Sequence, residues 1–314
     1  MKRQPFYPFK SERSKSEYQA YYLERAKAWP VANETMFLDT PSGTTLVRAS
    51  GHVTAPPLVL LPGARASSLM WSDSIAALSA HHRVYVLDIL GDAGLSVSRR
   101  ETLKPVDLAR WLDEVCAVLV PQGQFSLMGI SYGGLLAGQY AIRFPGRLRN
   151  VVLAAPGGFV LPFSLAFFVR IALLCMPLPG LGGGPFRRMI HWLFRDAERG
   201  DAACRARLEE TITDLQMSWR HFALPAPDWP TALADKGWQD FGVPCLFLVG
   251  ENEKIYSAKA AVARLHRVAP QVKTDIIPGA GHDLILVQPA LVARKVLEFL
   301  GKREGVPEPV VQEA

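Results

Sequence analysis

The chain has 314 residues, 49% of them hydrophobic and 20% charged, which is enough apolar material for a full buried core in one domain that carries an insertion. Its four cysteines are scattered without C-x-x-C spacing, which argues against a disulfide scaffold and favours free thiols in a reducing compartment. The formal net charge of +6 is spread widely and accompanies no nucleic-acid motif, so we expect no nucleic-acid partner.

A basic segment, residues 1–35, opens the chain. No apolar stretch follows residues 1–3, so the sequence predicts no secretory signal and a cytoplasmic location. Basic segments can bind acidic lipid or nucleic acid, but without a supporting motif the simpler prediction is a solvated, partly helical arm.

Short apolar runs recur after this arm and alternate with amphipathic stretches such as residues 105–119 and 257–268. This alternation is typical of a mostly parallel sheet with helices on both faces, so the predicted fold class is α/β. A Pro-Ser-Gly turn at residues 41–43 joins the first two runs and predicts an antiparallel start. The eight predicted strands lie near residues 36–39, 45–49, 58–61, 84–88, 124–128, 151–155, 245–249 and 273–277.

The alternation stops between residues 157 and 238. Because this segment lies between two predicted sheet strands, we interpret it as a helical cap or lid inserted into the core. The core itself is predicted to comprise residues 36–156 and 239–303, and residues 304–314 are predicted to be a flexible tail.

The first part of the insertion, residues 159–176, is apolar nearly all round and predicts a lid helix between the core and a substrate. Pro162 and Arg170 interrupt it, so it does not match the roughly 20 uninterrupted apolar residues of a membrane span. A lid that rests on a lipid surface stays open as an alternative. The glycine-rich residues 180–185 lack the Gly-Lys-Ser/Thr ending of a phosphate loop and predict a hinge or turn.

The most informative motif is Gly-Ile-Ser-Tyr-Gly at residues 129–133, directly after a predicted strand and before a predicted helix. A sharp strand-to-helix turn lifts a serine hydroxyl clear of the backbone and crowds the positions two residues before and after it, which favours glycine there. Ser131 is therefore the predicted nucleophile. The five-residue pattern alone is weak, and its context and matching partners give it weight.

A nucleophilic serine needs an imidazole base, and the base needs an acid that holds its tautomer. His282 lies on a glycine-rich loop after the last predicted strand, where it is free to reach a neighbouring site, so we predict it to be the base. The acid is expected after the strand at residues 245–249, where Glu253 is the first candidate and Glu251 is the alternative. The order of serine, acid and histidine along the chain is typical of hydrolases with a strand elbow.

Negative charge on an attacked carbonyl oxygen needs hydrogen-bond donors that are fixed in advance. The predicted donors of this oxyanion hole are the backbone N–H groups of Tyr132, at the start of the helix, and of Ala64, in the loop after the strand at residues 58–61. A simple surface turn is the alternative interpretation of that loop.

The apolar lid suggests a substrate with hydrocarbon or aromatic bulk. Arg65, beside the oxyanion loop, could meet a substrate carboxylate or be an ordinary exposed arginine. The candidate substrate-binding residues are Arg65, Phe163 and Phe167.

These motifs together resemble the α/β-hydrolase superfamily, and within it the chain is similar to bacterial carboxylesterases of the type that hydrolyses naproxen esters. The resemblance implies the α/β-hydrolase fold, with Ser131 as nucleophile, Glu253 as acid and His282 as base. Family members often carry His-Gly where this chain has Pro-Gly at residues 62–63, a departure that concerns the shape of the loop. The stretches that carry the resemblance are residues 60–64, 67–71, 86–92, 129–133, 250–256 and 280–282.

The sequence therefore predicts a serine hydrolase that cleaves carboxylic esters with an apolar portion through an acyl-enzyme intermediate. No metal or organic cofactor is expected, because there is no His-Glu-x-x-His motif and no paired-cysteine ligand set. The expected partner is a small-molecule ester, with no membrane contact, and the chain is expected to be a monomer or homodimer.

The same three side chains could instead cleave a carbon–carbon bond, or pass an acyl group to a thiol or alcohol as an acyltransferase or thioesterase. A catalytically silent receptor or binding module with the same fold is the alternative from a different class. An intact set of Ser131, Glu253 and His282 argues against that alternative.

Overall fold

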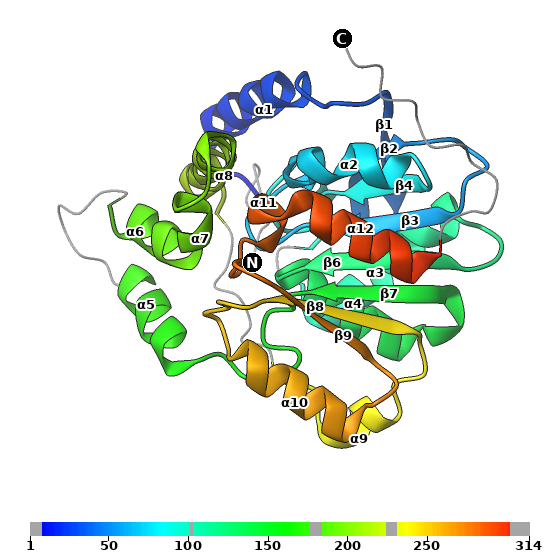
Figure 1. Ribbon diagram of the computed structural model, residues 1–314. Helices are drawn as coiled ribbons and strands as arrows, with labels where there is room; N and C mark the ends of the chain where they lie inside the picture. The colour runs from blue at the N-terminus through cyan, green and yellow to red at the C-terminus, as the bar shows by residue number, and fades with distance from the viewer. Residues whose placement is uncertain (1–7, 101–102, 176–183, 224–230, 302–314) are drawn as a thin grey trace, which may run out of the picture.

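The computed structural model describes residues 8–100, 103–175, 184–223 and 231–301 and is built around one sheet (Figure 1). The strand order is β1-β2-β4-β3-β6-β7-β8-β9, and the short strand β5 also pairs with β2. Both neighbours of β2 on the main path are antiparallel to it, and all later pairs are parallel. The strands are β1 (Asn33–Thr40), β2 (Gly43–Ser50), β3 (Pro57–Leu61), β4 (Arg83–Leu87), β5 (Val97–Ser98), β6 (Phe125–Ile130), β7 (Leu148–Ala154), β8 (Cys245–Gly250) and β9 (Lys273–Ile277).

The predicted α/β class and all eight predicted strands are confirmed, and β5 is the additional ninth strand. Helices cover both faces of the sheet, and the alternation of side chains along each strand divides the core in two. Leu58 and Leu60 of β3 share a cluster with α2 and α12, whereas Val59 and Leu61 share one with α3, α4 and α10. The helices and 3-10 turns of the core are η1 (Ser68–Trp71), α2 (Ser72–Ser79), α3 (Pro105–Leu119), α4 (Tyr132–Arg143), η2 (Pro145–Arg147), α9 (Asp235–Gln239), α10 (Ala258–Val268), α11 (Leu284–Val287) and α12 (Pro289–Leu300).

Strands β3, β6, β7, β8 and β9 are neighbours and run parallel, so their carboxyl ends meet at one edge of the sheet. The segments that follow β3, β6, β8 and β9 carry Ala64, Ser131 with Tyr132, Glu253 and His282, respectively. Ligands of such sheets bind beyond the carboxyl ends of the strands. The sheet topology therefore gathers the predicted site residues at that edge.

An insertion follows β7 and contributes α5 (Leu165–Cys175), α6 (Gly184–Leu193), α7 (Arg195–Glu198) and α8 (Ala202–His221), which Figure 1 shows grouped beside the sheet. The prediction of a lid helix over residues 159–176 is wrong at its start, because α5 begins only at Leu165. Phe159 and Val160 are instead fully buried in the core, and the Phe159 ring contacts the Trp238 ring edge-on. Pro162 restricts the backbone before it and lacks the N–H that a helix interior needs.

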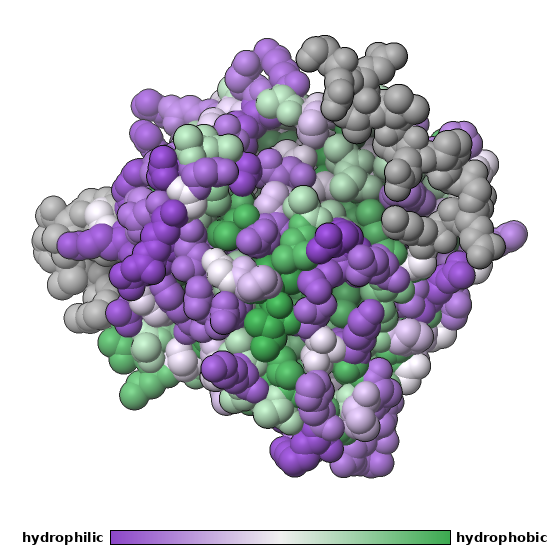
Figure 2. Space-filling model, in the orientation of Figure 1, coloured by the Kyte–Doolittle hydropathy of each residue, from purple (hydrophilic) through white to green (hydrophobic). Residues whose placement is uncertain are grey.

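Helix α5 exposes apolar side chains, and apolar atoms are visible in Figure 2 at the lower left, where Figure 1 places this helix. Leu165 is 80% exposed, and Phe168 and Val169 are also exposed. Within the described ranges, no helix combines the length and the apolar character needed to cross a membrane. Of the predicted hinge at residues 180–185, only residues 184 and 185 are described, and the predicted tail at residues 304–314 lies outside the described residues.

The N-terminal segment forms helix α1 (Glu12–Ala26), which lies against α8 of the insertion (Figure 1). The expectation of a solvated arm is wrong for one face of this helix, because Tyr18 and Tyr22 are buried. Their spacing of four residues places both rings on the same side of the helix. The Tyr18 ring meets Phe222, just after α8, edge-on with centroids 4.6 Å apart.

Candidate active site

Ser131 stands at the turn between β6 and α4 with φ 53° and ψ −114°. A non-glycine residue in such a sparsely populated conformation costs about 1–3 kcal/mol, so the surroundings must hold it. The Ser131 N–H donates to the Ala154 carbonyl at 2.9 Å, and the Ser131 carbonyl accepts from the Gly157 N–H at 3.0 Å. The backbone of Ser131 is therefore held by the last residue of β7 and by the segment that follows it.

The two glycines that flank the serine have no room for a side chain. A Cβ on Gly129 would lie 2.0 Å from the Gly133 carbonyl oxygen, and one on Gly133 would lie 2.4 Å from the Leu61 carbonyl oxygen. Both clashes are with backbone, which cannot rotate away as a side chain can. These distances agree with the expectation that the elbow needs glycine at both positions.

His282 follows β9 and reaches across to the elbow. Its Nε2 lies 2.9 Å from Ser131 Oγ, and its Nδ1 lies 2.9 Å from Glu253 Oε2. The ring is almost fully buried and is stacked on Phe194 of the insertion, with centroids 6.4 Å apart and planes 21° apart. The structure thus brings together the predicted serine, histidine and acid in one hydrogen-bonded row.

Glu253 is held at its other oxygen by the backbone. Its Oε1 accepts from the N–H groups of Lys254 and Ile255, both at 2.8 Å, and its side chain is 0% exposed. Glu251, the alternative acid, is exposed and accepts from the Gly279 N–H at 3.0 Å. The structure therefore places Glu253, and not Glu251, against His282.

Asp283 is a site residue that the sequence analysis missed. Its carboxylate accepts from the Gly281 N–H at 2.9 Å and from the Ala197 N–H of α7 at 2.7 Å. Burial raises the pKa of Asp283, and these two hydrogen bonds oppose that shift. The contact ties the histidine loop to the insertion, and the only sequence signal for it is an aspartate directly after His282.

The loop after β3 lies against the elbow. A Cβ on Gly63 would lie 3.6 Å from Ser131 Cβ, so the backbone of this loop passes beside the serine. The two predicted oxyanion donors belong to segments next to the serine: Ala64 follows Gly63 in this loop, and Tyr132 is the first residue of α4. The N–H groups of a first helical turn point outward along the helix dipole, which suits a developing negative charge.

The three candidate substrate-binding residues lie in two places. Phe163 borders the elbow, because a Cβ on Gly157 would lie 3.9 Å from its ring and 3.7 Å from the Ser131 carbonyl carbon. The Phe167 ring packs against the Phe163 ring with centroids 5.0 Å apart. Arg65 lies in the loop after β3, with its guanidinium 5.5 Å from the centre of the Trp219 ring.

The cysteines whose side chains are described, Cys116, Cys204 and Cys245, are free and buried. Burial raises the pKa of each thiol, which lowers the thiolate population and makes these groups poor nucleophiles. In the described part of the chain, no group of three or more histidine, cysteine, aspartate or glutamate side chains is arranged to hold a metal ion.

Comparison with known proteins gives consistent matches over most of the chain. A family model described as "Alpha/beta hydrolase family" matches residues 58–295. "Uncharacterized carboxylesterase nap" of Bacillus subtilis (strain 168) is 30% identical over 289 residues, which are 92% of this chain and 94% of that protein. "Carboxylesterase YbfK" of the same strain is 30% identical over 283 residues, 90% of this chain and 93% of that protein. The crystal structure of naproxen esterase (carboxylesterase NP) from Bacillus subtilis matches with a TM-score of 0.82 and 29% identity, and covers 93% of this chain and 100% of that chain.

Proposed function

The chain belongs to the alpha/beta hydrolase family, and from this membership we propose that it is a serine hydrolase that cleaves carboxylic esters through an acyl-enzyme intermediate. Similarity to carboxylesterases over 92% of its length supports the ester as the bond that is cleaved. The observation that carries the assignment of roles is the row of hydrogen bonds from Glu253 through His282 to Ser131.

In the first half of the reaction, Ser131 Oγ attacks the ester carbonyl carbon while His282 Nε2 takes the hydroxyl proton. Glu253 accepts from Nδ1–H, which leaves the Nε2 lone pair facing the serine and stabilises the imidazolium that forms. The carbonyl oxygen becomes an oxyanion, for which the N–H groups of Ala64 and Tyr132 are the proposed donors.

The tetrahedral intermediate then collapses. The bond between the carbonyl carbon and the alcohol oxygen breaks, and His282 returns its proton to the leaving alcohol, so the acyl group stays on Ser131. A water molecule then releases the acyl group from Ser131. His282 takes a proton from the water as its oxygen attacks the acyl carbon. The bond from that carbon to Ser131 Oγ then breaks, His282 returns the proton to Oγ, and the carboxylic acid leaves.

The substrate class follows from the surface beside the elbow. The rings of Phe163 and Phe167 pack together there, and α5 continues as an apolar helix with Leu165 exposed. These side chains support an ester whose acyl or alcohol portion is hydrocarbon or aromatic. We extend the proposal to the cap role of the insertion, to a cytoplasmic location and to a monomeric or homodimeric state, which rest on the sequence pattern alone.

A fluorophosphonate probe tests the proposal directly, because it labels only a serine that has been made nucleophilic. We expect labelling of the wild-type chain, its loss in Ser131→Ala, and hydrolysis of nitrophenyl esters that varies with acyl chain length. Ser126, a buried serine on β6 five residues away, provides a control, and Ser126→Ala should keep the labelling.

Absence of labelling in the folded wild-type chain would favour the alternative of a silent receptor or binding module. Labelling together with no hydrolysis of any ester, but with acyl transfer to an added thiol or alcohol, would favour an acyltransferase. Either result would overturn the proposed hydrolysis.

A further inference from the structure

Residues 63–66 form a tight turn that holds the proposed oxyanion donor Ala64. The Ala66 N–H donates to the Gly63 carbonyl at 3.2 Å, which closes a four-residue turn with Ala64 and Arg65 in its centre. Arg65 has φ 62°, and Ala64 is not among the non-glycine residues with positive φ. This combination defines a type II turn, whose third position normally carries glycine or asparagine.

An arginine at that position is strained, since side chains disfavour positive φ. The described non-glycine residues with positive φ are Arg65, Ser131 and Ala155, so two of the three lie at the site. Strained backbone persists only where the surrounding structure holds it in place. The turn therefore needs an external partner.

That partner is Asp92, which is 27 positions further along the chain. Both of its carboxylate oxygens accept from the Arg65 N–H, at 3.1 and 3.0 Å, and Oδ1 also accepts from the Ala93 N–H at 2.8 Å. Asp92 is only 8% exposed, which strengthens hydrogen bonds of this kind. A carboxylate accepts and cannot donate, so it selects the orientation of the central peptide in which the N–H points toward it.

We propose that Asp92 is a positioning residue for the oxyanion hole, which it acts on by locking the peptide between Ala64 and Arg65 in the type II orientation. Without it, that peptide can flip to the type I orientation, in which Arg65 has a relaxed negative φ. The flip turns the Arg65 N–H away from Asp92 and changes ψ of Ala64 and φ of Arg65, so the turn that presents the proposed donor is no longer held in one conformation. The proposal rests on the proposed function of Ala64, and it concerns transition-state stabilisation more than substrate binding.

The test compares Asp92→Ala in two backgrounds, Arg65→Ala and Arg65→Gly. Both backgrounds lack the guanidinium, so any attraction between the Arg65 and Asp92 charges is absent from the comparison. They differ in the strain, because glycine adopts positive φ freely and alanine does not. Asp92→Ala should lower kcat by about 10- to 100-fold in the Arg65→Ala background, with KM changed less than about 3-fold.

In the Arg65→Gly background, Asp92→Ala should lower kcat by less than about 3-fold, because glycine keeps the turn without help. Inhibition by phenylboronic acid, which forms a tetrahedral adduct on the serine, should weaken in parallel with kcat. Equal losses of kcat in both backgrounds would overturn the proposal, as would a loss confined to KM.

Thermal unfolding of each variant separates this effect from loss of the fold. If Asp92→Ala does not fold, Asp92→Leu fills the same buried space without an acceptor and should give the same dependence on the background. Ser131→Ala is measured alongside: activity that survives in it contradicts the proposed function itself. An inactive Ser131→Ala together with equal losses in the two backgrounds contradicts only the role of Asp92.

Discussion

One carboxylate oxygen of Glu253 lies 2.9 Å from Nδ1 of His282, while the other accepts from two backbone N–H groups. The backbone thus fixes one oxygen of the carboxylate, and the other oxygen faces the imidazole. This arrangement predicts what a neutral substitute would do. In Glu253→Gln, the amide oxygen would keep the two backbone donors, and the amide NH₂ group would face Nδ1.

An NH₂ group is a donor, so it would force Nδ1 to accept and move the ring proton to Nε2. His282 could then no longer accept the proton of Ser131, and we expect kcat to fall by about 10³- to 10⁴-fold. Glu251→Gln is the matched control, because Glu251 is two residues away and exposed, and its carboxylate accepts from the Gly279 N–H. Steady-state kinetics of the two variants would contradict the assignment if Glu251→Gln lost more activity than Glu253→Gln.

Much of this arrangement could be predicted from local sequence, because the strands and the elbow have local signatures. Apolar runs of four to six residues mark buried parallel strands, and Gly-x-Ser-x-Gly between a strand and a helix marks a crowded turn. The order of parallel strands then brings Ser131, Glu253 and His282 to one edge of the sheet. These predictions needed only the position of each residue relative to a strand end.

Contacts between distant segments have no such signature. Asp92 is 27 residues from Arg65. Nothing in the local sequence around either residue indicates that they are hydrogen-bonded. Tyr18 is buried against Phe222, about 200 residues further along the chain, and the hydroxyl of buried Tyr22 is hydrogen-bonded to Ser68. Phe159 belongs to the core because Trp238 meets it, although its apolar neighbours indicate a lid helix. In each case, the residue that decides burial or hydrogen bonding is too far away along the chain for a local sequence pattern to reveal it.

The crowding at the elbow predicts a large effect of one added methyl group. In Gly133→Ala, the new Cβ would lie 2.4 Å from the Leu61 carbonyl oxygen, so β3 and α4 would have to separate. Overpacking of this kind costs about 1–3 kcal/mol or more, and we expect the midpoint of chemical denaturation to fall accordingly. Gly146→Ala is the control, because a Cβ there would meet nothing within 4 Å. Equal stability of the two variants would show that the elbow can relax.

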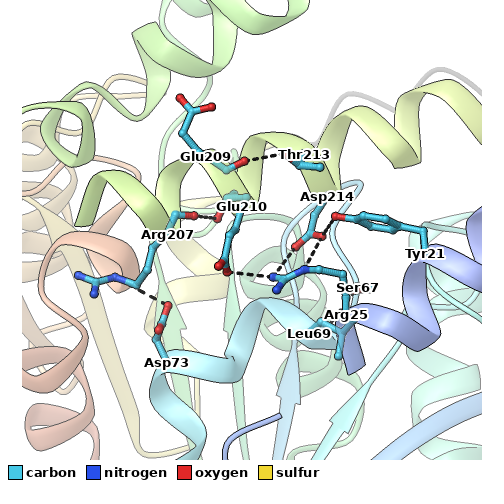
Figure 3. Close-up of polar contacts among 11 residues, drawn as sticks. Tyr21, Arg25, Ser67, Leu69, Asp73, Arg207, Glu209, Glu210, Thr213 and Asp214 are labelled. Carbon is cyan, nitrogen blue, oxygen red and sulfur yellow. Dashed lines mark hydrogen bonds and ion pairs between the residues drawn. The ribbon is translucent and has the colours of Figure 1, made fainter. Parts of the chain in front are cut away.

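A polar cluster between α1 and α8 predicts that the N-terminal helix stabilises the insertion (Figure 3). Arg25 of α1 meets Asp214 of α8 at 3.2 and 3.3 Å, and Tyr21 donates to the same carboxylate. Figure 3 shows both α1 side chains directed at α8, and the Arg25 and Asp214 side chains are only 23% and 22% exposed. Partial burial and shared partners make such a pair stronger than an exposed one.

A double-mutant cycle on Arg25→Ala and Asp214→Ala should give a coupling of about 1 kcal/mol in the free energy of unfolding. The exposed pair Arg13 and Glu17, within α1, provides the comparison and should give a smaller coupling, because solvent screens it. The kcat of the variants should stay near the wild-type value, since neither residue touches the elbow. A coupling no larger than that of the exposed pair would contradict a stabilising role for this contact.

The stability of the fold in mild acid should depend on His82. Burial, helped by the neighbouring charge of His81, lowers the pKa of His82 from 6.5 to about 4. Between these two pKa values the folded chain keeps the His82 imidazole neutral, whereas the unfolded chain binds a proton there. The stability that the neutral imidazole contributes is therefore present at neutral pH and lost as pH falls below 6.5. Between pH 6.5 and about 5 the loss should be on the order of 2 kcal/mol, and His82→Gln should remove that part of the slope in denaturation curves measured across the interval. His52→Gln, at an exposed position, is the control for the substitution. An unchanged slope in His82→Gln would show that the buried imidazole is not the group that titrates.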